Sequence, residues 1–177
     1  MIYQPAEDSY LLAKEVKKYS KGRKVLDVGA GSGILSKTAL ESGAKSTIAL
    51  DISPEAVSFL KSQGLSAVQS DLFSNIKEKF DLIVFNPPYL PKDKREDKAS
   101  QLATTGGKKG DEIILKFLKN VKSHLNKDGV TLILVSSLTP KKRICSILKK
   151  QELSYSIVSS SKLFMEKLEV WKISSNI

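Results

Sequence analysis

The 177-residue chain predicts an α/β fold: a doubly wound, mostly parallel sheet of seven strands, closed by a carboxyl-terminal antiparallel hairpin. Short apolar runs alternate along the chain with segments of helical periodicity, as parallel strands and their crossover helices do. The first apolar run, Val25–Val28, leads into a glycine-rich turn. Two strand-like runs near the end, separated by a Ser- and Lys-rich turn, predict the hairpin.

The individual elements follow in order from the amino terminus. An amphipathic helix is expected over residues 9–19, with an apolar face of Leu11, Leu12, Val16 and Tyr19. Ser53 is a good N-cap before a proline at the first helical position. Further helices are expected to begin near Ile34, Pro54, Asp111 and Pro140. Strands are expected near Val25, Ile48, Val68, Ile83, Leu132, Tyr155 and Leu168.

Length and composition predict one domain over residues 1–177. A chain of this size, with 41% hydrophobic residues, can bury roughly 70% of its unfolded surface. No apolar run could span a bilayer and no secretory signal opens the chain, so no membrane association is expected. The lone Cys145 fits a reducing, cytoplasmic compartment, and its helical surroundings predict a buried thiol. The single His124 is expected in a helix, without metal-ligand spacing, so no metal is expected.

Polar and glycine residues follow successive strands, which places them along one edge of the predicted sheet. Gly29, Gly31 and Gly33 follow the first strand and allow a ligand to approach the backbone closely. Asp51 follows the second strand, about 20 residues past the glycines, where a carboxylate can accept both ribose hydroxyls. Asp71 follows the third, weaker strand. Together these residues predict a nucleoside pocket.

The segment Asn86-Pro87-Pro88-Tyr89 follows the apolar run Phe80–Phe85. Open α/β sheets hold their ligands at the carboxyl ends of such strands, and two prolines make the backbone there rigid. The Asn86 side-chain oxygen and the Pro87 carbonyl can accept the two N–H groups of a planar amide, and Tyr89 can stack over it. An amide nitrogen so held presents its lone-pair face to a methyl group, so the gain comes from alignment and no strong base is needed.

The residues before the glycines favour a methyl donor over a dinucleotide. Asp27 precedes them, and its charge would attract the sulfonium and ammonium groups of S-adenosylmethionine. Asp27-x-Gly29-x-Gly31-x-Gly33, Asp51, Asp71 and Asn86-Pro87-Pro88-Tyr89 resemble the class I (Rossmann-like) S-adenosylmethionine-dependent methyltransferases that modify planar nitrogens.

The amino terminus narrows this resemblance. Tyr3-Gln4-Pro5-Ala6-Glu7-Asp8-Ser9 resembles the opening of the HemK-like release-factor glutamine methyltransferases, in their short archaeal and eukaryotic branch. The likeness continues at Gly106-Gly107 and through Glu112, so it spans Tyr3 to Glu112. The family often carries Arg where Asp111 stands here, which puts any anionic contact of that Arg in doubt.

This resemblance implies an activity, a site and partners. The reaction would methylate the glutamine of the Gly-Gly-Gln loop of the translation release factor and leave S-adenosylhomocysteine. A small zinc-binding activator subunit would pair with the strand near Val68. The acceptor would lie against Asn86, Pro87, Pro88 and Tyr89. The donor would be held by Ser9, Asp27, Gly29, Gly31, Asp51, Asp71, Leu72 and Asn86.

An adenine amino group is also planar with two N–H donors, so a nucleic-acid methyltransferase is the alternative. The net charge of +10 and the pI near 9.6 favour it. Against it, only Arg23, Arg95 and Arg143 are arginines, and the chain has no spare length for a target-recognition domain. Other acceptors, or a non-catalytic module that binds the cofactor, stay open. The segment Pro91–Gly107 is either an ordinary loop or a substrate lid.

Overall fold

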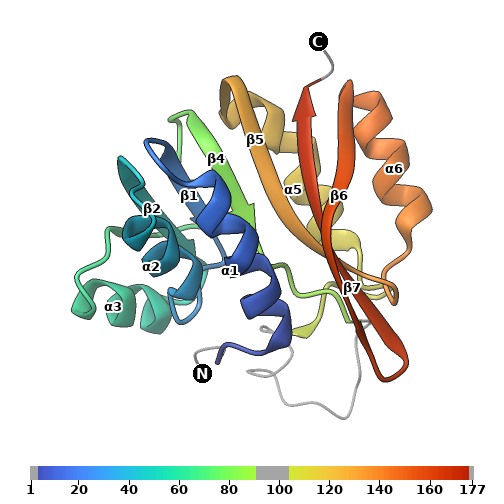
Figure 1. Ribbon diagram of the computed structural model, residues 1–177, viewed down its shortest axis with the longest axis horizontal. Coiled ribbons are helices and arrows are strands. Elements are labelled where there is room, and N and C mark those ends of the chain that lie inside the picture. Colours follow the sequence, from blue (N-terminus) through green and yellow to red (C-terminus); the bar gives the residue numbers. More distant parts are fainter. Residues whose placement is uncertain (1–3, 91–103, 176–177) are drawn as a thin grey trace.

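One twisted sheet forms the centre of the molecule. The computed structural model describes residues 4–90 and 104–175. Within them, seven strands follow the order β3-β2-β1-β4-β5-β7-β6 (Figure 1). The first five are parallel, and β7 runs antiparallel to both β5 and β6. The strand bounds are β1 Lys24–Val28, β2 Ser46–Asp51, β3 Ala67–Gln69, β4 Phe80–Phe85, β5 Leu125–Ser136, β6 Leu153–Leu163 and β7 Glu166–Ser175. This is the doubly wound fold that the sequence predicts.

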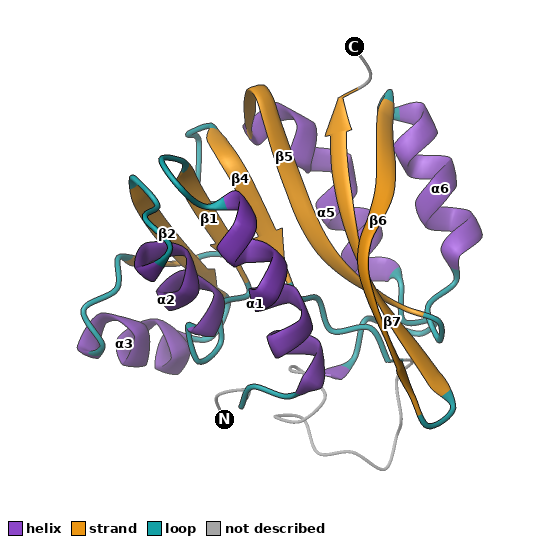
Figure 2. Ribbon diagram, viewed as in Figure 1, coloured by secondary structure: helices purple, strands orange, loops and turns teal. Residues whose placement is uncertain are grey.

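Helices cover both faces of the sheet (Figure 2). Their bounds are α1 Glu7–Tyr19, α2 Ile34–Glu41, α3 Pro54–Ser62, α5 Glu112–Val121, the 3-10 turn η1 Lys122–His124 and α6 Lys141–Lys150. Leu12 of α1 and Leu35 of α2 pack against one face, and Phe117 of α5 and Leu148 of α6 pack against the other. Strand residues alternate between the two faces, so the strands carry apolar side chains on both sides.

The expected helix starts are close to the observed ones. Helix α1 begins at Glu7, two residues earlier than predicted, and its Leu12 and Val16 are fully buried. The Ser53 hydroxyl accepts a hydrogen bond from the Ala56 backbone N–H at 3.2 Å, so the predicted N-cap is confirmed. Within the described part of the chain, no helix is long and apolar enough to cross a membrane.

Two local expectations are corrected. His124 ends the 3-10 turn η1 and does not lie in an α-helix; its ring stacks on Phe73, and its Nε2 lies 3.1 Å from the Ile76 carbonyl oxygen. Cys145 is only partly buried, since it lies at the side of α6 with its Sγ 3.7 Å from the Tyr155 hydroxyl.

The carboxyl-terminal hairpin is longer than the sequence predicts. Serines at 159–161 have low strand propensity, yet they pair with residues 168–170 of β7 after a bulge at Val158. The predicted loop at 91–107 falls mostly outside the described residues. Its last part is described, and Leu90 forms an isolated parallel bridge with Thr105.

Strand register brings the polar strand ends together. Val28 at the end of β1 pairs with both Leu50 of β2 and Phe85 of β4. The next residue in each strand is therefore Gly29, Asp51 or Asn86, and all three emerge at one edge of the sheet.

Candidate active site

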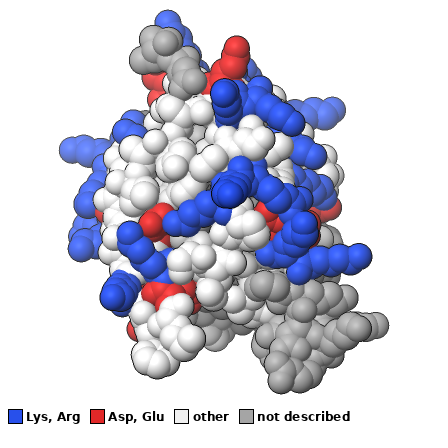
Figure 3. Space-filling model, turned by 90° about the vertical axis from the view of Figure 1, so that its right-hand side faces the viewer, with Lys and Arg blue, Asp and Glu red and all other residues white. Residues whose placement is uncertain are grey.

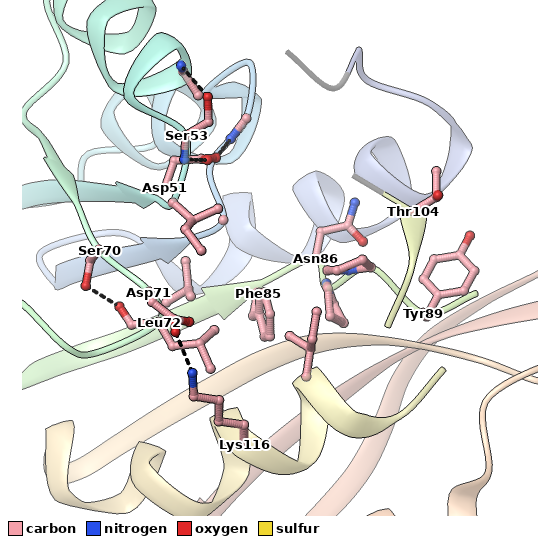
Figure 4. A pocket seen from close by; sticks show the side chains of 18 of the residues that line it. Asp51, Ser53, Ser70, Asp71, Leu72, Phe85, Asn86, Tyr89, Thr104 and Lys116 are labelled. Atoms are coloured by element: carbon pink, nitrogen blue, oxygen red, sulfur yellow. Dashed lines mark hydrogen bonds and ion pairs between the residues drawn. The ribbon is translucent and has the colours of Figure 1, made fainter. Parts of the chain in front are cut away.

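A cavity of about 360 Å³ opens at this carboxyl edge of the parallel strands (Figure 4). Its residues come from the ends of β1, β2 and β4, from the segments that follow β1, β2, β3 and β4, and from α1, α3 and α5. They are Asp8, Val28, Gly29, Gly31, Asp51, Ile52, Ser53, Ala56, Ser70, Asp71, Leu72, Phe85, Asn86, Pro87, Pro88, Tyr89, Leu90, Thr104, Ile113 and Lys116. Most of the residues predicted for the site are thus brought together in one cavity.

The glycine turn and the β2 carboxylate form one rigid wall of the cavity. The Gly31 N–H donates to Asp51 Oδ2 and the Ser53 N–H to Asp51 Oδ1, each at 2.9 Å. Gly29 has a φ of +65°, and a Cβ there would stand 3.4 Å from the Phe85 ring. Each Asp51 oxygen keeps acceptor capacity beyond its backbone partner, so the carboxylate suits a pair of hydroxyl donors.

The loop after β3 forms the opposite wall. Leu72 has a φ of +51°, and its carbonyl accepts a hydrogen bond from the Ser70 hydroxyl at 2.7 Å. Asp71 makes an exposed ion pair of 2.6 Å with Lys116 of α5. The apolar side chains of Leu72, Phe85 and Ile113 give this part of the cavity surfaces on which a flat ring can pack.

The Asn86 side chain has a fixed orientation. Its amide nitrogen donates to Asp8 Oδ2 at 3.2 Å and to the Ser9 hydroxyl at 3.4 Å. Its Oδ1 is buried and has no hydrogen-bond partner among the described residues. Both neighbours on the nitrogen side accept hydrogen bonds, so the amide cannot flip without losing them. Asn86 therefore presents an unsatisfied acceptor, which a donor from outside the chain can satisfy.

Two of the residues predicted to bind the donor do not line the cavity. Ser9 is buried in α1 and contacts Asp8 and Asn86. Asp27 is fully buried, and its Oδ2 accepts bonds from the Ser36 N–H at 2.9 Å and the Ser36 hydroxyl at 2.7 Å. Burial raises the pKa of Asp27 to about 7, although the bonds from Ser36 act in the opposite direction. Asp27 Oδ1 has no partner among the described residues.

Comparison with known proteins decides the family. Residues 6–165 match the family described as "Methyltransferase small domain". The chain is 39% identical, over 97% of its length and 92% of the relative's, to MJ0928 of Methanocaldococcus jannaschii, which is classed with the protein N5-glutamine methyltransferases. The chain belongs to the HemK2/Mtq2-like N5-glutamine methyltransferases.

Two further relatives of this methyltransferase agree. The eRF1 methyltransferase catalytic subunit mtq2 of Schizosaccharomyces pombe is 26% identical over 97% of this chain and 88% of its own length. The structure of the E. cuniculi Mtq2-Trm112 complex, described as responsible for methylation of the eRF1 translation termination factor, has a TM-score of 0.81. The two sequences are 25% identical, and the structural match covers 99% of this chain and 99% of the other.

The methyltransferase carries site residues that the sequence analysis did not single out. Asp8 belongs to the amino-terminal motif, and a polar residue one position before a predicted helix is equally typical of a helix cap. Ile113 and Lys116 belong to no motif. They line the cavity only because α5 packs beneath it. The spacing Ile113–Phe117 on a helix gave no functional signal.

The paired glycines of the methyltransferase have a packing reason. A Cβ on Gly106 would stand 2.7 Å from the Pro88 carbonyl oxygen, so Gly106 lets this segment lie directly against the Asn86–Tyr89 backbone. Asp111 is fully buried and accepts a 2.7 Å bond from Arg143 of α6. Here the acid therefore joins α5 to α6.

Proposed function

We propose that this enzyme transfers the methyl group of S-adenosylmethionine to the side-chain amide nitrogen of the glutamine in the Gly-Gly-Gln loop of the translation release factor. The observation that carries the proposal is the buried, unpartnered Oδ1 of Asn86 beside the cavity. The likeness to proteins described as eRF1 methyltransferases supports the choice of acceptor.

The donor fits the half of the cavity nearest β1, β2 and β3. Asp51 would accept the ribose hydroxyls, Leu72 and its apolar neighbours would hold the adenine, and Gly29 and Gly31 would admit the amino-acid part. Asp27 and Ser9 stay assigned to the donor by resemblance. The unpartnered Asp27 Oδ1 fits such a role, because a cationic group beside it would compensate its burial. When bound, the donor supplies an electrophilic methyl group.

The acceptor amide fits the Asn86–Tyr89 half. Asn86 Oδ1 and the Pro87 carbonyl would accept its two N–H groups, and the Tyr89 ring would lie against its plane. As the nitrogen–carbon bond forms, the sulfur–carbon bond breaks and S-adenosylhomocysteine leaves. The nitrogen, now cationic, then releases a proton to water. The contribution of the chain is alignment of the nitrogen with the methyl group.

A labelled-donor assay tests the acceptor. The purified chain is incubated with methyl-labelled S-adenosylmethionine and either release factor or total RNA. We expect label on the factor at the Gly-Gly-Gln glutamine. Label on RNA and none on the factor would reject the proposal in favour of the nucleic-acid alternative.

The role of Asn86 gives a sharper prediction. Asn86→Ala removes the acceptor and is expected to lower the transfer rate by about a hundredfold or more, comparable to the loss of one oriented polar group in other active sites. Donor binding, measured by calorimetry, stays detectable. Asp8→Ala frees the Asn86 amide and is expected to lower kcat with the donor Kd nearly unchanged. A full rate for Asn86→Ala would contradict the role given to its oxygen.

We also propose a partner. The Mtq2 relative of known structure is complexed with Trm112. In this chain β3 pairs only with β2 among the described strands, so its outer edge carries unpaired backbone groups that a partner strand can bind. We propose that a small zinc-binding subunit pairs there.

A further inference from the structure

Exposed apolar side chains gather at the edge of the sheet that holds the cavity. Tyr10 lies in the first turns of α1, Ile52 follows β2, and Leu138 follows β5, and all three are exposed. Phe164 and Met165 form the turn between β6 and β7 and are 94% and 84% exposed. Single exposed apolar residues are scattered over the surface of most proteins. Two large apolar residues that are adjacent and almost fully exposed are different, because they form a contiguous apolar surface.

The Phe164–Met165 tip projects beyond the sheet on a rigid support. Pairing of β5 with β7 ends at Ser136 and Leu168, so the turn extends past the carboxyl end of β5. Figure 1 shows the tip on the same side as the carboxyl ends of β1 and β4. At its base the Ser136 hydroxyl donates to Glu166 Oε1 at 2.6 Å, and the Lys167 N–H donates to the Ser137 hydroxyl at 2.9 Å.

Folding alone gives no reason for these two residues. Met165 has a φ of +63°, where a residue with a side chain costs about 1–2 kcal/mol and glycine costs nothing. Neither side chain recovers this cost through burial within the described chain. A partner surface would bury both, and Phe and Met are enriched where proteins associate.

We propose that the Phe164–Met165 tip docks the protein acceptor, inserting into an apolar recess on its surface while the acceptor amide enters the cavity. This inference rests on the proposed function. Strand β7 lies two strands from β4, which is about 10 Å across the sheet. Phe85 at the end of β4 is level with Trp171 of β7 through Ile133 of β5, so the tip lies about six residues, or about 20 Å, beyond the end of β4. A standard interface of about 800 Å² per partner has a radius of about 16 Å, so one folded acceptor domain can cover both places.

The tip and the acceptor-binding half of the cavity also share one core. Tyr89 and Leu163 pack against the same cluster, which includes Leu168 and Val170. The position of the tip relative to the Asn86–Tyr89 segment is thus fixed before any partner binds, which lowers the entropic cost of docking.

The charge distribution favours a protein over a nucleic acid at this place. Lysine and arginine side chains cover much of the face shown in Figure 3, which includes the basic helix α6. The lowest described part of that view is white, so its surface is formed by uncharged residues. A nucleic acid would gain from cations at the tip, where Phe164 and Met165 offer none. Lys162 and Lys167 face each other just behind the tip, and Lys167 pairs with Glu169. They suit acidic groups around the recess of the acceptor.

The double variant Phe164→Ser/Met165→Gly tests the docking. Removal of the side chain at a positive φ keeps the fold, so the thermal midpoint should stay level or rise. We expect KM for the release factor to rise about tenfold or more, as for loss of an aromatic anchor, with kcat within about twofold of the unaltered enzyme. The Kd for the factor, measured directly by calorimetry, should rise in parallel. Ile157 is an exposed apolar residue of β6 that lies away from the tip, so Ile157→Ser is the matched control and should change neither KM nor Kd.

A short Gly-Gly-Gln peptide separates this inference from the proposed function. The peptide cannot reach the tip, so its kcat/KM should be the same for the variant and the unaltered enzyme. An unchanged KM and Kd for the factor would overturn the docking role, as would an equal loss on factor and peptide. A dimer of the unaltered chain that the variant abolishes would show that a second copy covers the tip. If the unaltered enzyme methylates neither factor nor peptide yet binds the factor through the tip, the proposed function fails and the docking surface stands.

Discussion

Asp27 is a buried carboxyl whose protonation links the stability of the fold to pH. Its ordinary pKa of 3.8 is raised to about 7, first by burial and further by the charge of Asp51, against the two bonds from Ser36. At neutral pH the group is therefore close to half protonated. A cationic donor beside its unpartnered oxygen would favour the charged form.

The raised pKa predicts a pH dependence of folding. Between about pH 4 and pH 7 the folded chain holds a proton on Asp27 that the unfolded chain has lost, so this stability is present at low pH. It falls by about 1.4 kcal/mol per pH unit as the pH rises towards 7. Asp27→Asn cannot titrate. Urea unfolding of both proteins at pH 5 and pH 8 should show the unaltered chain losing about 3 kcal/mol relative to the variant; identical pH profiles would contradict this account.

At the scale of elements, the glycine-rich turn is held by packing as much as by ligand access. Gly33 is the N-cap of α2 and has a φ of +79°. A Cβ there would stand 2.6 Å from Leu60 Cδ2 and 2.8 Å from Leu65 Cδ1. The third glycine of the motif therefore lets the start of α2 lie against Leu60 and Leu65, whereas Gly29 and Gly31 line the cavity.

A pair of variants separates backbone strain from this close approach. Gly64 has a similar φ of +76°, but a Cβ there would meet nothing within 4 Å. Gly64→Ala should lower the free energy of unfolding by about 1–2 kcal/mol through backbone strain alone. Gly33→Ala should lower it by about 1–3 kcal/mol more, because two leucines must move. Denaturant titration measures both, and equal losses would mean that the leucines yield freely.

At the scale of the whole molecule, the two edges of the sheet differ. The β6 edge belongs to a long hairpin whose strands pair along ten positions. The β3 edge has only three residues, and Gln69 at its end is exposed. A short strand at a sheet edge is weakly held, so a partner strand would stabilise it and the adjoining Ser70–Leu72 wall of the cavity.

This asymmetry predicts a response to the activator. Co-expression with the zinc-binding subunit should raise both soluble yield and transfer rate. Gln69→Pro places a residue without an N–H at the edge and should weaken the complex, detected by gel filtration, while the variant alone keeps the thermal midpoint of the unaltered chain within about 5 °C. Unchanged yield and rate on co-expression would remove the partner from the proposal.

The linear order of residues determined the fold class and most of the site. Strand and helix periodicity repeat along the chain, and glycines, Asp51, Asp71 and Asn86 each directly follow a strand, so their meeting at one edge follows from parallel pairing alone. Those are local signals, and each can be detected without any knowledge of distant contacts. The extended hairpin was underestimated because its serines have weak strand preference.

Tertiary packing decided the rest. Only the folded chain brings Asp8 against the Asn86 amide, 78 positions away, and so leaves one oxygen without a partner. Only packing of α5 beneath the sheet places Ile113 and Lys116 in the cavity, and only the position of β7 carries Phe164 and Met165 to the same edge. Such contacts depend on the summed geometry of many elements, and no pattern along the chain encodes a distance between residues so far apart.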